Sequence, residues 1–267
     1  MEPTTVKLWD NAPGQLEGEE IPSITCYPAN PQTTRAALVI FPGGGYAFRA
    51  DHEGKGYAEW ANGLGMSAFV VNYRVKPYAF PASANDARRA VRYVRAHAAE
   101  FNVDPDRICV MGSSAGGHAA AFLCTYRGPL EGEGVDAVDT YSYLPNAQIL
   151  CYPVISLVEA DIWHKGSVEI FMGTANLPWT VSSFSPDRIA DAQTPQAFIW
   201  HTAEDGGVNV INSYRYAERL RRMNVPVEMH IFPHGGHGMG LASGMPYVAR
   251  WSEMCAEWFK LIGFLPA

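Results

Sequence analysis

Short apolar runs alternate along the chain with longer amphipathic segments, and this alternation constrains the fold more than any other feature. The apolar runs have the length of strands and lie at residues 36–41, 68–73, 107–111, 148–152, 196–202 and 227–232. Helical spacing of apolar residues occurs at residues 53–62, 83–97, 115–126, 208–223 and 246–262. The pattern predicts an α/β fold with a mostly parallel central sheet, right-handed crossovers and helices on both faces.

The chain has the size and balance of one globular domain. Its 267 residues are 48% hydrophobic and 18% charged, and no repeat or linker divides them, so we predict a single domain over residues 1–267. Residues 128–191 interrupt the strand and helix rhythm with Gly, Pro and aromatic residues. A small cap-like insertion over the carboxyl edge of the sheet and a set of ordinary connecting loops explain this stretch equally well.

Charge and cysteine content narrow the class of protein. The 20 basic and 27 acidic residues give a net charge of −7, which argues against nucleic-acid binding. The arginines of segment 83–97 are expected to face solvent. Five cysteines, an odd number, lie mostly inside apolar runs and predict buried free thiols in a reducing compartment. No leader pattern or run of ~18 apolar residues is present, so we expect a cytoplasmic protein without a membrane span. No Cys-x-x-Cys pair occurs, and no metal site is expected.

The segment Gly112-Ser113-Ser114-Ala115-Gly116 follows the run 107–111 directly and precedes an Ala-rich helical segment. A tight strand-to-helix turn exposes the hydroxyl of its central serine and requires small residues two positions to either side. The pattern therefore predicts Ser114 as a nucleophile, with Ser113 pointing elsewhere. Because a serine hydroxyl is a weak nucleophile at its free pKa, it needs a neighbouring base.

A base and an acid are available later in the chain, each after an apolar run. His237, flanked by glycines after run 227–232, is favoured as the base over His234. Asp205, just before a glycine turn after run 196–202, is favoured as the acid over Glu204. Its carboxylate would hold the imidazole tautomer and stabilise the imidazolium. The order Ser114, Asp205, His237 is that of the α/β-hydrolase catalytic triad.

Backbone amides could form an oxyanion hole beside Ser114. The amide of Ala115 lies at the start of a helix, where N–H groups lack intrahelical acceptors. Gly44 and Gly45 follow run 36–41, and glycine lets the backbone approach a substrate oxygen closely. We predict these three amides as donors, with a simple flexible turn as the alternative for the glycines.

The sequence resembles the α/β-hydrolase superfamily, and within it the acetyl xylan esterases and the hormone-sensitive-lipase-like carboxylesterases. The resemblance extends over about residues 36–240 and is carried by Pro42-Gly43-Gly44-Gly45-Tyr46, Asn72-Tyr73-Arg74, Ser114-Ala115-Gly116-Gly117-His118 and His201-Thr202-Ala203-Glu204-Asp205. Many relatives carry a histidine where Pro42 stands, but backbone donors do not need that imidazole. His118 resembles a family position and is interpreted as a helix-packing residue.

The resemblance implies a serine esterase for small acetyl-type esters, on carbohydrate such as acetylated xylan or xylo-oligosaccharides, with no metal or organic cofactor. Tyr46, Trp163 and Trp179 are candidates for stacking on a sugar ring, with core packing as the alternative. His52 and Glu53 could line the entrance to the site or cap a helix.

The expected partner is a small-molecule or oligosaccharide ester, without nucleic acid or membrane, and a homo-oligomer is compatible with the sequence. Two other functions stay open: a peptidase of the prolyl-oligopeptidase kind, and a catalytically silent hydrolase fold used for binding. A silent relative is expected to have lost a member of the triad, and here all three positions are filled.

Overall fold

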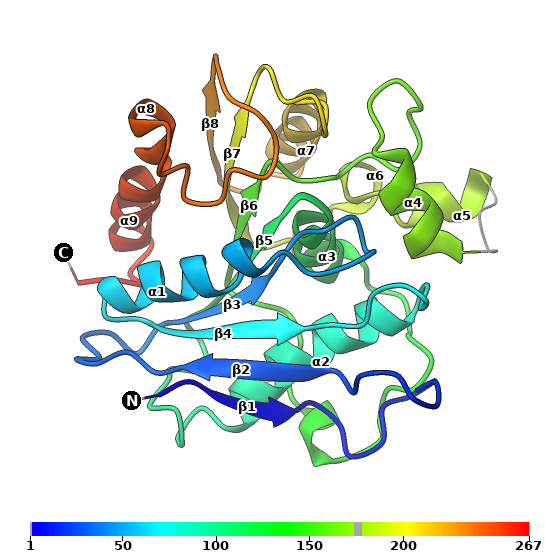
Figure 1. Ribbon diagram of the computed structural model, residues 1–267, viewed down its shortest axis with the longest axis vertical. Coiled ribbons are helices and arrows are strands. Elements are labelled where there is room, and N and C mark those ends of the chain that lie inside the picture. Colours follow the sequence, from blue (N-terminus) through cyan, green and yellow to red (C-terminus); the bar gives the residue numbers. More distant parts are fainter. Residues whose placement is uncertain (1, 174–177, 267) are drawn as a thin grey trace.

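The computed structural model describes residues 2–173 and 178–266, except for the side chains of residues 178–180. At its centre lies one eight-stranded sheet (Figure 1). The strands are β1 (Thr4–Lys7), β2 (Ser23–Tyr27), β3 (Ala37–Phe41), β4 (Ser67–Asn72), β5 (Ile108–Ser113), β6 (Ala147–Cys151), β7 (Gln196–Thr202) and β8 (Val227–Phe232).

Helices connect the strands and cover the sheet. The α-helices are α1 (Lys55–Gly63), α2 (Ala82–Ala96), α3 (Ser114–Thr125), α4 (Lys165–Met172), α5 (Pro178–Ser183), α6 (Pro186–Ile189), α7 (Ile211–Arg222), α8 (Pro246–Ala249) and α9 (Trp251–Leu261). The 3₁₀ turn η1 (Asp51–Glu53) precedes α1, and the 3₁₀ turn η2 (Ala137–Thr140) follows α3.

The strand order is β1-β2-β4-β3-β5-β6-β7-β8. The six strands from β4 to β8 in this order pair in parallel, whereas β1 and β2 pair antiparallel at one end of the sheet. The predicted mostly parallel sheet with covering helices is therefore confirmed.

The apolar runs identified in the sequence begin at residue 36, but two strands, β1 and β2, precede that residue. β1 has largely exposed side chains, and β2 alternates polar and apolar residues. Neither strand is buried on both faces, so neither carries the continuous apolar run that marks the parallel strands.

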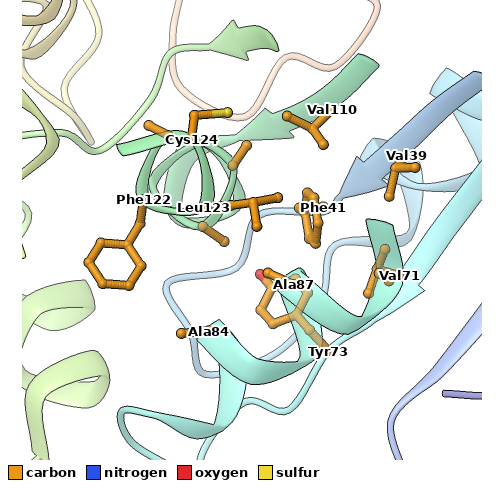
Figure 2. Close-up of a cluster of buried hydrophobic side chains, with 14 of the residues drawn as sticks. Val39, Phe41, Val71, Tyr73, Ala84, Ala87, Val110, Phe122, Leu123 and Cys124 are labelled. Atoms are coloured by element: carbon orange, nitrogen blue, oxygen red, sulfur yellow. The ribbon is translucent and has the colours of Figure 1, made fainter. Parts of the chain in front are cut away.

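Alternate side chains of the central strands supply two separate cores, one on each face of the sheet. Val39, Phe41 and Val110 pack with α2 and α3 on one face, where Figure 2 shows the cluster. Leu38 and Met111 point the other way, toward α1 and α9. Because both faces are covered, the strands are apolar throughout, as the sequence pattern indicated. All five cysteines are buried and free, which confirms the predicted buried free thiols.

Two arginines of α2 do not face solvent, so that expectation was wrong for them. Arg88 and Arg89 are both buried. Arg88 pairs with Glu133 at 2.9 Å and Arg89 pairs with Asp136 at 2.6 Å, which fastens the segment around η2 onto α2. Carboxylates more than 40 residues away in sequence make the burial of these guanidinium groups tolerable.

Residues 128–191 divide between the sheet and its surroundings. β6 joins the central sheet, and η2 packs on α2. Helices α4, α5 and α6 gather beyond the sheet near α3 (Figure 1). Within residues 2–173 and 178–266, no helix combines the length and apolar composition that crossing a bilayer requires.

Candidate active site

The predicted site residues all follow the carboxyl ends of parallel strands. The glycine run follows β3, Ser114 follows β5, Asp205 follows β7 and His237 follows β8. Since parallel strands end at the same edge of the sheet, residues far apart in sequence converge there.

The turn from β5 into α3 has the geometry that the sequence predicted. Ser114 has φ +53°, which lies in the left-handed region that residues other than glycine rarely adopt. A Cβ atom on Gly112 would lie 2.0 Å from the carbonyl oxygen of Gly116, and one on Gly116 would lie 2.0 Å from the carbonyl oxygen of Phe41. Only glycine fits at either position. Ser113 points away from Ser114, and its Oγ lies 2.9 Å from the hydroxyl of Tyr57.

Ser114, His237 and Asp205 form a continuous hydrogen-bonded chain. Nε2 of His237 lies 2.8 Å from Oγ of Ser114, and Nδ1 lies 2.7 Å from Oδ2 of Asp205. The two residues that were not favoured lie apart from this chain: His234 and Glu204 are exposed and contact each other at 2.9 Å. This arrangement lets the Ser114 hydroxyl donate to Nε2 while Nδ1–H donates to the carboxylate.

Hydrogen bonds keep Asp205 ionised although its carboxylate is buried. Burial alone would raise the pKa of Asp205 and is the largest single influence on it. Hydrogen bonds from His201, His237 and the Val208 amide outweigh burial, so the pKa lies below its usual range. Oδ1 accepts from the amides of Gly207 at 2.8 Å and Val208 at 2.9 Å. The carboxylate is thus fixed in place and charged at neutral pH.

His201 is a second histidine on the same carboxylate, and sequence reasoning did not assign it a role. Its Nδ1 accepts from the Ser213 hydroxyl at 2.8 Å, which leaves the proton on Nε2. Nε2–H then donates to Asp205 Oδ2 at 3.1 Å and to the Val208 carbonyl oxygen at 3.0 Å. His201 and His237 therefore share Oδ2 of Asp205, and His201 helps to hold the carboxylate in place. The sequence feature that could have identified His201 is its position at the end of a strand, four residues before Asp205.

The glycine loop presents its backbone toward Ser114. Gly44, Gly45 and Tyr46 have φ values of +126°, +65° and +62°. Successive left-handed residues turn neighbouring N–H groups toward one concave side. Among the described residues, no acceptor takes up the amide of Gly44 or Gly45. A Cβ atom on Gly44 would lie 2.2 Å from the carbonyl oxygen of Phe48, so this loop also requires glycine.

The third candidate donor, the amide of Ala115, lies in the first turn of α3. Amides in the first turn have no intrahelical acceptor, and the helix dipole adds positive potential there. The glycine loop lies directly against Ser114, since a Cβ atom on Gly43 would come 3.1 Å from Ser114 Cβ. Amides of the loop and of α3 thus flank the serine.

Glu53 links the loops on either side of the serine. Its side chain is only 2% exposed, and it caps no helix, so the capping interpretation was wrong. Oε2 accepts from the Gly43 amide at 2.8 Å, and Oε1 accepts from the Tyr152 hydroxyl at 2.7 Å. The Tyr152 oxygen in turn accepts from the Gly240 amide at 2.8 Å. One carboxylate therefore joins the glycine loop to the loop that carries His237.

Tyr152 also contacts the histidine itself. It follows β6 with φ +37°, and its ring centroid lies 5.1 Å from that of His237. Burial, followed by the nearby charge of Glu53, raises the pKa of Tyr152 well above its usual range. The hydroxyl is therefore always a donor to Glu53 near neutral pH.

The serine and histidine open into a cleft of about 450 Å³. Its wall consists mostly of glycine, alanine and larger apolar residues, with few polar side chains. The lining residues are Gly44, Gly45, Ala47, Phe48, Ala50, His52, Glu53, Ser114, His164, Gly166, Ile170, His237 and Gly238. His52 lies at the cleft as expected, whereas Phe48, His164 and Ile170 were not anticipated. Segment 164–170 belongs to the stretch for which a cap was one interpretation.

Of the three aromatic candidates for sugar stacking, the two whose side chains the structure describes do not line this cleft. Tyr46 is 2% exposed, and its hydroxyl lies 2.7 Å from Nδ1 of His118, so its ring is not available to a substrate. Trp163 is half-buried and packs against the core on the α2 and α3 face. Trp179 falls in α5, and its side chain lies outside the described part of the chain. The exposure of an aromatic ring depends on tertiary packing, so it could not be predicted from the sequence.

His118 serves packing, as interpreted from the sequence. It is fully buried, and its Nε2 donates to the Phe184 carbonyl oxygen at 3.2 Å while Nδ1 accepts from Tyr46. Burial lowers the pKa of His118 to about 4, so the ring is neutral. In the described ranges, no group of three or more His, Cys, Asp or Glu side chains is arranged to hold a metal ion.

Known proteins resemble this chain over most of its length. The model of the BD-FAE family matches residues 25–220. Endo-1,4-beta-xylanase B of Butyrivibrio fibrisolvens is 33% identical over 236 residues, which are 87% of this chain and 36% of that protein. Acetylxylan esterase of Xylanibacter ruminicola is 30% identical over 264 residues, which are 97% of this chain and 50% of that protein. The chain thus spans half or less of the length of these two relatives.

A solved structure agrees with these sequence matches. The acetyl ester-xyloside bifunctional hydrolase from Caldicellulosiruptor lactoaceticus is 41% identical, with a TM-score of 0.92 over 98% of this chain and 97% of that chain. Fold, sequence and family match agree, and they confirm the resemblance inferred from the motifs. The chain belongs to the BD-FAE family of α/β hydrolases.

Proposed function

We propose that the protein is a serine esterase that hydrolyses small, acetyl-type carboxylic esters on carbohydrate, such as acetylated xylan or xylo-oligosaccharides. The observation that carries the proposal is the continuous Ser114–His237–Asp205 hydrogen-bonded chain at an open cleft. A filled triad argues for an enzyme rather than for a silent binding protein.

The proposed reaction has two halves, acylation of Ser114 and hydrolysis of the acyl ester, and the same three side chains act in both. Ser114 Oγ attacks the acyl carbonyl carbon while His237 Nε2 takes its proton. The amides of Gly44, Gly45 and Ala115 stabilise the negative oxygen of the tetrahedral intermediate. His237 then gives the proton to the leaving alcohol, and an acyl–Ser114 ester remains. Water, deprotonated by His237, releases the carboxylic acid and restores the serine, while Asp205 steadies the imidazolium throughout.

The acetyl preference and the carbohydrate alcohol have separate support. A cleft of about 450 Å³, with Phe48 and Ile170 on its wall, accommodates a short acyl group together with part of the alcohol. The names of the relatives support the alcohol: one is an acetylxylan esterase, and another is an acetyl ester-xyloside hydrolase.

Two measurements test the proposal. Stoichiometric labelling by a fluorophosphonate probe that is lost in Ser114→Ala is expected for the esterase, whereas an unlabelled wild-type protein would favour the silent binding fold. A hydrolysis panel should then rank acetylated xylo-oligosaccharides and acetyl esters above butyryl and feruloyl esters. Faster hydrolysis of a prolyl peptide than of any ester would favour the peptidase instead.

A further inference from the structure

His164 lies just before α4 and caps that helix with one of its two ring nitrogens. Nδ1 accepts from the Ser167 amide at 3.2 Å and lies 2.7 Å from the Ser167 hydroxyl. A ring nitrogen that accepts an amide N–H carries no proton, so the neutral imidazole must carry its proton on Nε2. The cap therefore selects the tautomer of His164.

The Nε2–H group of His164 has no acceptor among the described residues. The ring lines the same cleft as Ser114 and His237. It faces the glycine loop, since a Cβ atom on Gly45 would lie 3.9 Å from its Cε1. Burial, followed by the proximity of His237, lowers the pKa of His164. The ring is therefore neutral at pH 7 and offers a single N–H donor to the cleft.

The other polar side chains of the cleft wall are already engaged or exposed. Both carboxylate oxygens of Glu53 are hydrogen-bonded within the protein. His52 is largely exposed, and its Nε2 lies 2.9 Å from the carbonyl oxygen of Gly238. A half-buried donor without an acceptor is costly unless a ligand or water pairs with it.

We propose that His164 determines specificity by donating its Nε2–H to a hydroxyl of the alcohol half of the substrate, next to the ester. This inference rests on the proposed esterase function. The developing negative oxygen already has the backbone donors of the glycine loop and α3, and an acetyl group offers no other acceptor. On a sugar or polyol ester, the remaining acceptors belong to the alcohol half, and the hydroxyl next to the ester is one of those nearest to the reacting carbonyl.

The test uses His164→Asn, because asparagine is a good helix N-cap and its side chain is too short to bring a donor to the same place. Initial rates are compared on a monoacetylated xylo-oligosaccharide and on p-nitrophenyl acetate, whose alcohol half has no hydroxyl beside the ester. One hydrogen bond to an uncharged acceptor corresponds to a loss of about three- to tenfold in kcat/KM. We expect that loss on the oligosaccharide, mainly through KM, and no change on p-nitrophenyl acetate.

His52→Asn is the matched control, because it shortens the other cleft histidine, whose Nε2 is already paired. It should not separate the two substrates. Equal losses on both substrates in His164→Asn, or no loss on either, would overturn the role of His164 while leaving the esterase intact. A wild-type protein that turns over neither ester would contradict the proposed function itself and this inference with it.

Discussion

At the scale of single residues, Glu53 is the side chain on which the geometry around Ser114 depends most after the triad. Its two oxygens hold the amide of Gly43 and the hydroxyl of Tyr152, and Tyr152 holds the amide of Gly240. The loop with the candidate oxyanion donors and the loop with the histidine are thus fixed to one buried carboxylate.

We predict that Glu53→Ala lowers kcat on p-nitrophenyl acetate by about 10²-fold with little change in KM, because small misplacements of catalytic groups have effects of that order. Glu53→Gln, which keeps an acceptor for Gly43, should recover part of the loss. The control is Glu59→Ala, which removes an exposed carboxylate of α1. Steady-state kinetics that show only a higher KM, or equal defects in Gln and Ala variants, would contradict this role.

His118 predicts a pH dependence of stability. Its pKa is about 4 in the folded protein, below the value of about 6.5 for an unfolded chain. Because the unfolded state binds the proton more tightly, the free energy of unfolding is highest above about pH 6.5 and decreases as the pH falls toward 4. At pH 5 the loss amounts to about 2 kcal/mol in the free energy of unfolding.

Urea unfolding of wild type and His118→Gln at pH 7 and pH 5 checks this effect. The wild type should lose about 2 kcal/mol more than the variant between the two pH values. His234→Gln, which removes an exposed histidine, should behave like the wild type. Parallel losses in wild type and His118→Gln would show that His118 does not carry this pH dependence.

Ser114, Asp205 and His237 could be selected from the sequence as candidates because each belongs to a local pattern at a strand end. Ser114 has its flanking glycines, and Asp205 and His237 each precede a glycine. Glu53 and His201 were harder to anticipate, because their partners Tyr152 and Ser213 lie in other segments of the chain. His164 has a local partner, but the sequence does not show that its ring faces the cleft. The stacking expectation for Tyr46 failed for the same reason: its exposure depends on what α3 and α4 place against it.

At the scale of elements, the approach of α3 to the sheet is set by glycine. The Phe41 carbonyl at the end of β3 lies so close to Gly116 in α3 that no Cβ atom fits on Gly116. This contact brings the first turn of α3, with Ala115, beside the glycine loop. Helix α3, which supplies one candidate oxyanion donor, thus contacts the end of β3, and the loop that follows β3 supplies the other two.

We predict that Gly116→Ala destabilises the protein by about 1–3 kcal/mol, the usual range for overpacking, and lowers kcat by displacing α3. Gly56→Ala is the matched control, since Gly56 lies in α1 with open space around it and alanine favours helix by up to about 1 kcal/mol. Denaturant unfolding gives both values. A Gly116→Ala protein as stable and active as the Gly56→Ala protein would show that the close contact is unimportant.

Elements with their own strong periodicity were predictable, and elements that depend on neighbours were not. The six parallel strands appeared as apolar runs, and two of them, β7 and β8, have the predicted bounds. The antiparallel β1 and β2 have no such run and were missed. The predicted helix 246–262 is divided into α8 and α9 at Arg250. Burial of Arg88 and Arg89 depends on acidic partners outside α2 and could not be read from its periodicity.

At the scale of the whole molecule, the parallel sheet collects four separate segments at one edge. Residues 43–46, 114, 205 and 237 come together only because β3, β5, β7 and β8 run in the same direction. His164, just before α4, and Gly166 and Ile170 within α4 then close one side of the cleft. We therefore predict a short-lived acyl ester on Ser114 at this edge of the sheet.

Trapping that acyl ester identifies the residue that carries the acyl group. Acid quenching during turnover of p-nitrophenyl acetate, followed by peptide mass mapping, should find an acetyl group on the peptide that contains Ser114. Ser114→Ala should carry no such group and should lose about 10⁶-fold in kcat, as expected for removal of a triad nucleophile. Acetyl groups on another residue, or full turnover by Ser114→Ala, would contradict the account.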